Sequence, residues 1–133
     1  MPRAVTAARY ALGALFFVFG LNGFLGFIPQ PPHPAAASAL LEAFVASGYL
    51  MTLVKLTETV GGALLLANRF VPLVLVALLP VTVNIALFHA VLDRAMPGLL
   101  VGALVLALNG FLIWAYRTYY APLKEARATP RRP

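Results

Sequence analysis

The chain has 133 residues, of which 62% are hydrophobic and only 11% are charged. This composition excludes a soluble globular domain of the same size, because too few polar side chains remain to cover its surface in water. The net charge of +6 comes largely from the two ends, which is typical of membrane orientation and not of nucleic-acid binding. No cysteine is present, so disulfides, thiolate metal sites and cysteine nucleophiles are excluded. We expect one integral membrane domain over residues 1–133, with the lipid bilayer as its surroundings.

The first predicted membrane span runs from Tyr10 to Ile28, close to the ~20 residues that a spanning helix needs. A cleaved signal peptide is the alternative, since basic residues, an apolar run and small residues occur in that order. The apolar run exceeds the ~7 to 15 residues of a signal core and contains Asn22, which favours a retained span. Four prolines between residues 29 and 34 then end the helix, because proline lacks an amide donor.

A short helix at the membrane interface is predicted next, from Ala35 to Ser47. Its leucines and Phe44 are apolar while Glu42 is polar, which is the pattern of a helix lying in the interface plane. It is too short to span the bilayer.

Three further spans are predicted over residues 48–67, 70–92 and 98–116. Only Asn68 and Arg69 separate the second span from the third, so these two should form a tight antiparallel pair, and Pro72 suits the first turn of the third. The fold class is therefore an all-α bundle of four transmembrane helices. The tail from Ala121 to residue 133, with its prolines and charges, is predicted to be mobile.

The distribution of basic residues predicts that both termini are cytoplasmic in a bacterial inner membrane. Arg94 alone falls on the outer side, and the inner side carries the others: Arg3, Arg9, Arg69, Arg117, Lys124, Arg127, Arg131 and Arg132. Trp114 and the tyrosines at 116, 119 and 120 lie where the last span should meet the inner head groups, as an aromatic belt would.

Two charged residues lie inside the second span. Lys55 and Glu58 each cost about 2.5 to 3.5 kcal/mol near a helix centre, so the segment needs partner helices. Their i, i+3 spacing places them on one helix face, where they can pair. Counted at ~1.5 Å per residue, they lie about 10 and 15 Å below the outer boundary. Because intramembrane charges are functional by default, we interpret them as a ligand-binding site, with neutralisation of one by the other as the alternative.

Four more polar residues extend this predicted outer-half pocket, three at similar depths and one near the midplane: Asn22, Asn84, His89 and Asn109. The asparagines are interpreted first as interhelical hydrogen-bonding groups and second as ligand contacts. His89 is interpreted as an interfacial imidazole bonded to Asp93, which lies one turn further on. Asp93 and Arg94 are taken as a solvated loop, and His33, among prolines, as incidental. The chain contains no standard catalytic motif, and two histidines are too few for a histidine-rich metal site.

Several short motifs occur in a fixed order along the chain: Phe19–Phe24 closing in Phe27–Pro29, Ser47–Leu50, Lys55 and Glu58 followed by Gly61–Leu66, Asn68–Pro72, and Pro80–Ile85 running to His89. In these motifs the chain resembles the DoxX-like family of small bacterial four-span membrane proteins, from about Arg9 to Leu123. The resemblance implies a four-helix membrane fold, with polar family positions at Asn22, Lys55, Glu58, Asn84 and His89. At Asn109 it implies a glutamate in close relatives, so this residue is a departure.

The roles that the resemblance implies do not agree with one another, since relatives are linked to thiosulfate:quinone oxidoreductase, to a membrane oxidoreductase complex acting in oxidative stress, and to receptor-assembly chaperones. The first hypothesis is a membrane subunit of an oxidoreductase system, with a redox protein partner, that binds a quinone or similar head group. The second is a non-enzymatic assembly or chaperone module that holds a partner's transmembrane helix. The third is a permeation or export unit, for which a chain of this size would have to form a homo-oligomer.

Overall fold

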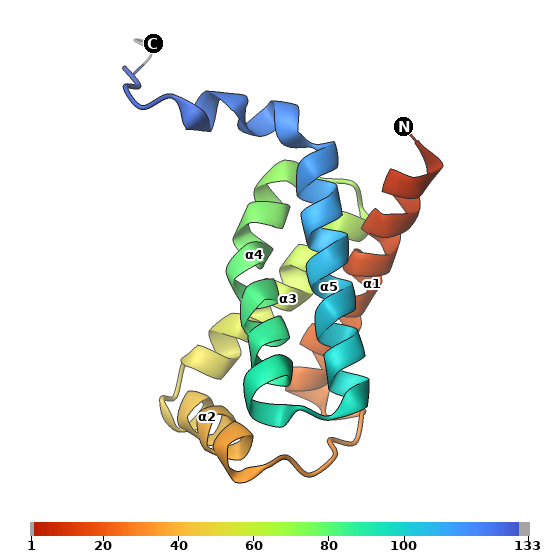
Figure 1. The fold of residues 1–133 in the computed structure, drawn as a ribbon, viewed down its shortest axis with the longest axis vertical. Helices are drawn as coiled ribbons and strands as arrows, with labels where there is room; N and C mark the ends of the chain where they lie inside the picture. The colour runs from red at the N-terminus through yellow and green to blue at the C-terminus, as the bar shows by residue number, and fades with distance from the viewer. Residues whose placement is uncertain (1, 131–133) are drawn as a thin grey trace.

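The computed structural model describes residues 2–130, and within this range the chain is helical with no strand (Figure 1). The bounds of its elements are α1 (Arg3–Leu25), α2 (Ala35–Ala46), α3 (Leu50–Leu66), α4 (Val71–Leu87), the π-helix η1 (Phe88–Asp93), α5 (Met96–Ala115) and the 3₁₀ helix η2 (Arg117–Lys124).

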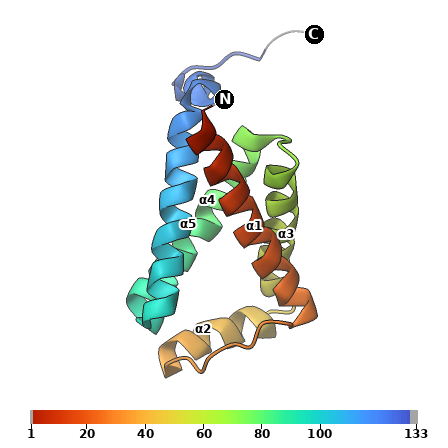
Figure 2. The ribbon, with the colours of Figure 1, turned by 90° about the vertical axis from the view of Figure 1, so that its right-hand side faces the viewer.

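Four long helices stand side by side, and α2 lies across one end of them (Figures 1 and 2). Helix α1 packs mainly against α3, and α4 packs mainly against α5. In Figure 2 the ribbons of the two pairs approach each other at the end where α1 begins, and they separate towards α2. The start of α1 and the end of α5 therefore lie at one end of the bundle, and α2 lies at the other.

The apolar core occupies the half of the bundle nearest the start of α1. Its members come from four helices: Val5, Ala8, Leu12, Phe16, Leu65, Val71, Val74, Leu75, Leu78, Val105 and Leu112. Many large apolar side chains, such as Leu73 on α4 and Leu100 and Leu104 on α5, are instead exposed. An exposed apolar surface of this extent suits lipid and not water.

Three helices are long and apolar enough to cross a membrane, and a fourth span is possible if α2 and α3 count together. The three are α1, the continuous run of α4 with η1 over Val71–Asp93, and α5. Helix α3 has only 17 residues, about 25 Å at ~1.5 Å per residue, and its axis is bent by 91° from that of α2. The chain is therefore a multi-pass membrane protein by the length and composition of its helices.

Local chemistry explains where the helices begin and end. Gly26 adopts the left-handed conformation that ends α1, and Pro72 and Pro97 occupy the first turns of α4 and α5. Before α3, the Ser47 hydroxyl accepts a hydrogen bond from the Leu50 amide at 3.0 Å. This bond satisfies one of the free amides at the start of the helix.

The helix bounds differ from the predicted spans mainly at the two ends of the chain. Helix α1 begins at Arg3, seven residues before the predicted span, and ends at Leu25. The short helix predicted before the second span is present as α2. At the other end η2 continues to Lys124, within the tail that was predicted to be mobile from Ala121. The part of that predicted tail at residues 131–133 lies outside the described residues, as do Arg131 and Arg132.

Candidate functional site

The two charged residues of α3 form an ion pair inside the bundle. The Lys55 Nζ lies 2.9 Å from the Glu58 Oε2, which confirms that the i, i+3 spacing brings them together. Glu58 is 3% exposed, whereas the Lys55 side chain keeps 23% of its surface exposed. The carboxylate is therefore enclosed, and Lys55 is the member of the pair whose side chain is partly exposed.

Glycines on α1 allow this part of α3 to approach closely. A Cβ atom at Gly23 would collide with the aliphatic part of the Lys55 side chain, and one at Gly20 would come within 2.9 Å of the Thr59 Cα. The Thr59 hydroxyl donates to the Lys55 carbonyl at 2.7 Å, so it is satisfied within α3. In lipid there is no hydrophobic driving force between helices, so small residues favour association by letting the backbones come into close van der Waals contact. The charged pair is thus packed directly against the backbone of α1.

Asn22 closes the end of α1. Its side-chain oxygen accepts a hydrogen bond from the Ile28 amide at 2.7 Å, and the residue is buried. The Gly26 amide donates to the Asn22 backbone carbonyl at 2.8 Å in the same turn. Asn22 therefore fixes the backbone at the start of the proline-rich link. This contact is a structural one, whereas Asn22 was predicted as an interhelical hydrogen-bonding group or a ligand contact.

Asn109 joins α5 to α4 in the core. Its amide nitrogen donates to the Thr82 hydroxyl at 2.8 Å, and both residues are fully buried. The amide oxygen has no hydrogen-bond partner within residues 2–130. This is the interhelical hydrogen bond expected first for the asparagines. The sequence analysis missed Thr82, because one hydroxyl in an apolar run gives little signal.

Asn84 lies apart from the charged pair. It is exposed on α4 and lines a groove of about 280 Å³ together with Leu40 of α2, Leu87, Phe88 and two further apolar residues. Neither Lys55 nor Glu58 lines this groove. Its predicted role beside the pair stays a prediction.

A histidine–aspartate–histidine cluster lies at the end of the bundle near α2. The Asp93 carboxylate hydrogen-bonds to both imidazoles. The His89 Nδ1 lies 3.0 Å from one carboxylate oxygen, and the His33 Nδ1 lies 2.9 Å from the other. Phe88 contacts both imidazole rings edge-on. The bond between His89 and Asp93 is confirmed. The interpretation of His33 as incidental is wrong, and so is that of Asp93 as solvated, since it is only 8% exposed.

The local backbone explains how this cluster forms. The π-helical turn η1 carries His89 and Asp93, and the left-handed Arg94 ends it. The start of α5 approaches so closely that a Cβ atom at Gly98 would collide with the His89 ring. Sequence reasoning missed His33 because 60 residues separate it from Asp93. His33 reaches Asp93 because the link after α1 runs beneath the end of the bundle where Asp93 lies.

Arg9 was predicted only as an inner-side charge, yet it is 4% exposed within the bundle. Its guanidinium donates to the carbonyls of Leu65 and Leu66 in the last turn of α3, and it lies 4.4 Å from the Tyr10 ring centroid. A cation in this position satisfies free carbonyls and complements the helix dipole. A signal for this role was present, because Arg9 is followed by an uninterrupted apolar run.

The six predicted site residues thus fall into separate places in the structure. Lys55 and Glu58 lie together, His89 belongs to the cluster around Asp93, Asn22 and Asn109 bond to Ile28 and Thr82, and Asn84 lines a groove. Within residues 2–130, no group of three or more histidine, aspartate or glutamate side chains has the geometry to hold a metal ion. Comparison of the chain with models of protein families, with curated proteins and with solved structures finds no match.

Proposed function

We propose that the protein crosses the membrane four times, through α1, α3, α4 and α5, with α2 at the outer surface. The bond between His33 and Asp93 supports this arrangement, because two residues in contact must lie on the same side of the bilayer. The chain between them contains α3 and α4, which must then cross an even number of times. The right-angled turn between α2 and α3 is what an interfacial helix leading into a span requires.

Both termini lie on the cytoplasmic side of a bacterial inner membrane in this proposal. The start of α1 and the end of α5 are at the same end of the bundle (Figure 1), and that end carries Arg3, Arg69 and the basic residues of η2. Arg94 is at the opposite end, so the balance of basic residues favours the first end as cytoplasmic.

Reporter fusions test this orientation. Alkaline phosphatase inserted between Pro31 and Ala37 should be active, because the enzyme folds outside the cytoplasm, and a fusion at the C-terminal end should be inactive. The reverse pattern would refute the proposed orientation, and activity at both positions would refute the four crossings.

The function that the geometry supports best is that of a membrane subunit of an oxidoreductase system, with a quinone head group bound at the Lys55–Glu58 pair. The observation that carries it is the buried ion pair within an apolar span, a costly arrangement that marks functional sites in membranes. The resemblance to the DoxX-like family supports the same class of role. The electrons come from a redox protein partner.

The two charges have separate tasks in this proposal. The partly exposed Lys55 ammonium donates a hydrogen bond to a quinone carbonyl, and it stabilises the negative charge that develops there on reduction. Glu58, held 2.9 Å away, relays one after the other the two protons that quinol formation takes up together with the two electrons from the redox partner.

Paired substitutions separate this site from simple packing. Glu58→Gln should keep the fold and weaken binding of a short-chain quinone at least tenfold, because the amide cannot balance the lysine charge. Lys55→Met combined with Glu58→Leu should fold at least as well as the natural chain, since apolar residues often replace a buried ion pair without loss, but should bind no quinone. The measurements are the melting temperature in detergent and quinone binding to the same preparations.

Thr57→Val serves as the control, because Thr57 is a half-buried polar residue of α3 whose hydroxyl donates to the Leu53 carbonyl of the same helix. Its quinone affinity should be unchanged. A double apolar variant that still binds quinone would leave the pair as packing. Failure of the natural chain to bind quinone, with one membrane protein co-purifying, would favour the assembly module instead.

A further inference from the structure

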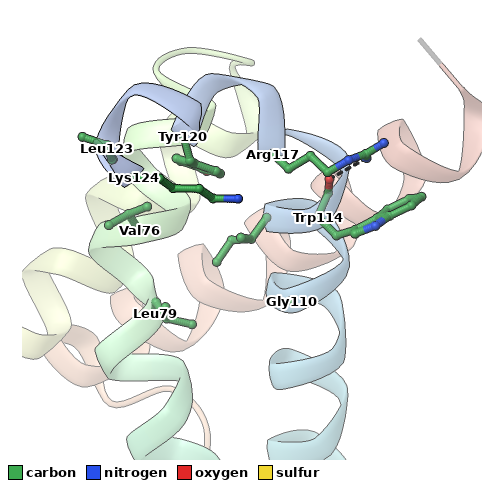
Figure 3. A pocket seen from close by; sticks show the side chains of 9 residues that line it. Val76, Leu79, Gly110, Trp114, Arg117, Tyr120, Leu123 and Lys124 are labelled. Atoms are coloured by element: carbon green, nitrogen blue, oxygen red, sulfur yellow. Dashed lines mark hydrogen bonds between the residues drawn. The ribbon is translucent and has the colours of Figure 1, made fainter. Parts of the chain in front are cut away.

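The opposite end of the bundle carries a second feature, a groove of about 390 Å³ between α4 and α5 beneath η2 (Figure 3). Val76 and Leu79 of α4 and Ile113 of α5 line its apolar part. Gly110 also lines it, and a Cβ atom there would meet no neighbouring atom within 4 Å. The missing side chain at Gly110 therefore leaves space that nothing in residues 2–130 fills.

Helix η2 forms the mouth of this groove. It leaves the end of α5 and runs across the bundle towards the start of α4 (Figure 1), where the Tyr120 hydroxyl donates to the Pro72 carbonyl at 2.8 Å. Burial, and to a smaller degree the neighbouring Tyr116, raise the pKa of Tyr120 above its ordinary value, so the hydroxyl remains a donor to higher pH than a free tyrosine. Helix η2 is thus fastened over the inner end of the groove.

Two cations stand at this mouth. Figure 3 shows the Lys124 side chain reaching from η2 across the space between α4 and α5. Arg117 also lines the groove, but Figure 3 shows its guanidinium turned away from Lys124, where it donates to the Trp114 carbonyl at 2.9 Å and covers the indole ring. Within residues 2–130 the ion pairs are those of Lys55 with Glu58 and of His33 and His89 with Asp93. Neither Lys124 nor Arg117 takes part in one. Lys124 thus forms no ion pair within residues 2–130, although Glu125 follows it in the chain.

The geometry points to a binding site for an anionic phospholipid, with one acyl chain in the groove beside Gly110 and the head-group phosphate on Lys124, with Arg117 as the second cation at the rim. An apolar slot that opens to the lipid and ends in unpaired cations has the same order of polarity as a phospholipid. Basic pockets between transmembrane helices bind lipid head groups in this way. In the proposed orientation the site faces the cytoplasmic leaflet, which carries anionic lipids.

A free anion does not account for these features, because it would leave the apolar part of the groove empty. A partner's transmembrane helix would fill the apolar part but would place an apolar segment against two unpaired cations. The lipid is the one occupant that matches both halves of the site.

The test measures how tightly the full chain, purified in detergent, retains phosphatidylglycerol relative to phosphatidylcholine, by native mass spectrometry. The natural chain should prefer the anionic lipid, and Lys124→Gln should reduce that preference roughly fivefold, the effect of one cation near an anionic lipid. Arg69→Gln removes the same charge from the exposed turn between α3 and α4, outside the groove, and should leave the preference unchanged.

Filling the groove tests the apolar half separately. Gly110→Leu keeps every charge but occupies the slot, so retention of phosphatidylglycerol should fall, and Gly110→Ala should have a smaller effect in the same direction. Millimolar inorganic phosphate should not displace the lipid. The proposal is overturned by equal retention of the two lipids, by equal effects of Lys124→Gln and Arg69→Gln, or by displacement with phosphate.

A crosslink decides against the competing occupant. Because the chain has no cysteine, Leu123→Cys provides a single reactive position at the mouth of the groove and leaves the space beside Gly110 free. A photoreactive label attached there in native membranes should capture phospholipid. Capture of another protein's transmembrane segment in place of lipid would refute the proposal.

Discussion

The contact between α1 and α3 and the contact between α4 and α5 hold the bundle together in different ways. At the first, glycines let the backbones touch, as at Gly62, where a Cβ atom would lie 2.8 Å from the Phe17 Cα and from the Gly13 carbonyl oxygen. At the second, α4 and α5 contribute large core side chains such as Leu75 and Leu112 and are joined by the bond between Asn109 and Thr82. The one glycine near the α4 backbone, Gly102, leaves a wider gap, because a Cβ atom there would lie 3.2 Å from the Ala86 Cα.

The difference shows what each contact can tolerate. The α1–α3 contact depends on glycines, which have no side chain. A larger residue at one of these positions should therefore disrupt the contact, whether the new side chain is polar or apolar. The α4–α5 contact depends on a polar pair enclosed by apolar residues, so loss of one partner should weaken it while its shape remains. The charged residues Arg9 and Lys55 both lie at the first contact, where Arg9 meets the backbone of α3 and Lys55 meets Gly23 of α1.

The largest effect is expected from Gly62→Leu. The added side chain would collide with the backbone of α1 at Phe17, which cannot move away as a flexible side chain can. Overpacking of this kind costs about 1 to 3 kcal/mol, and we expect the upper end because the obstacle is main chain. The measurement is the melting temperature in detergent.

Gly110→Leu is the matched control, since the same substitution there meets open space. Its melting temperature should stay close to that of the natural chain. A similar loss in both variants would mean that leucine is harmful at any helical glycine, and the contrast between the two contacts would fail.

A smaller effect is expected from Thr82→Val. This change keeps the shape of the side chain but removes the hydroxyl that accepts from Asn109, which leaves that buried amide nitrogen without a bond. Interhelical hydrogen bonds in membranes contribute about 0.6 to 2 kcal/mol, so the melting temperature should fall modestly. Thr82→Ser keeps the hydroxyl and should recover most of the loss. An unchanged Thr82→Val variant would show that packing alone holds α4 to α5.

The fold could be predicted from the sequence where one segment carries its own signal. The apolar runs gave the long helices, and the prolines after residue 28 gave the break before α2. The i, i+3 spacing of Lys55 and Glu58 gave the ion pair, because both residues belong to one helix. The bond between His89 and Asp93 followed from the same kind of local spacing.

The rest of the candidate site depends on which helix faces meet, and local spacing does not contain that information. Depth alone predicts Asn84 beside the charged pair, and because a helix has several faces this stays a prediction; Asn84 is exposed on α4. The partners of Asn109 and Arg9 are 27 and 56 residues away in the chain. Helix α1 begins seven residues before the predicted span, and Arg9 lies within this helix and is buried.

The bond between His33 and Asp93 also sets an order of events during synthesis. A chain is made from its N-terminus, so the link after α1 emerges before α3, α4 and the turn at Asp93 exist. His33 cannot bond to the Asp93 carboxylate until α4, which precedes Asp93 in the chain, has been inserted. The segment from the link through α2 can reach its final place only after the third of the long helices is in the membrane, which makes its docking a late step in assembly.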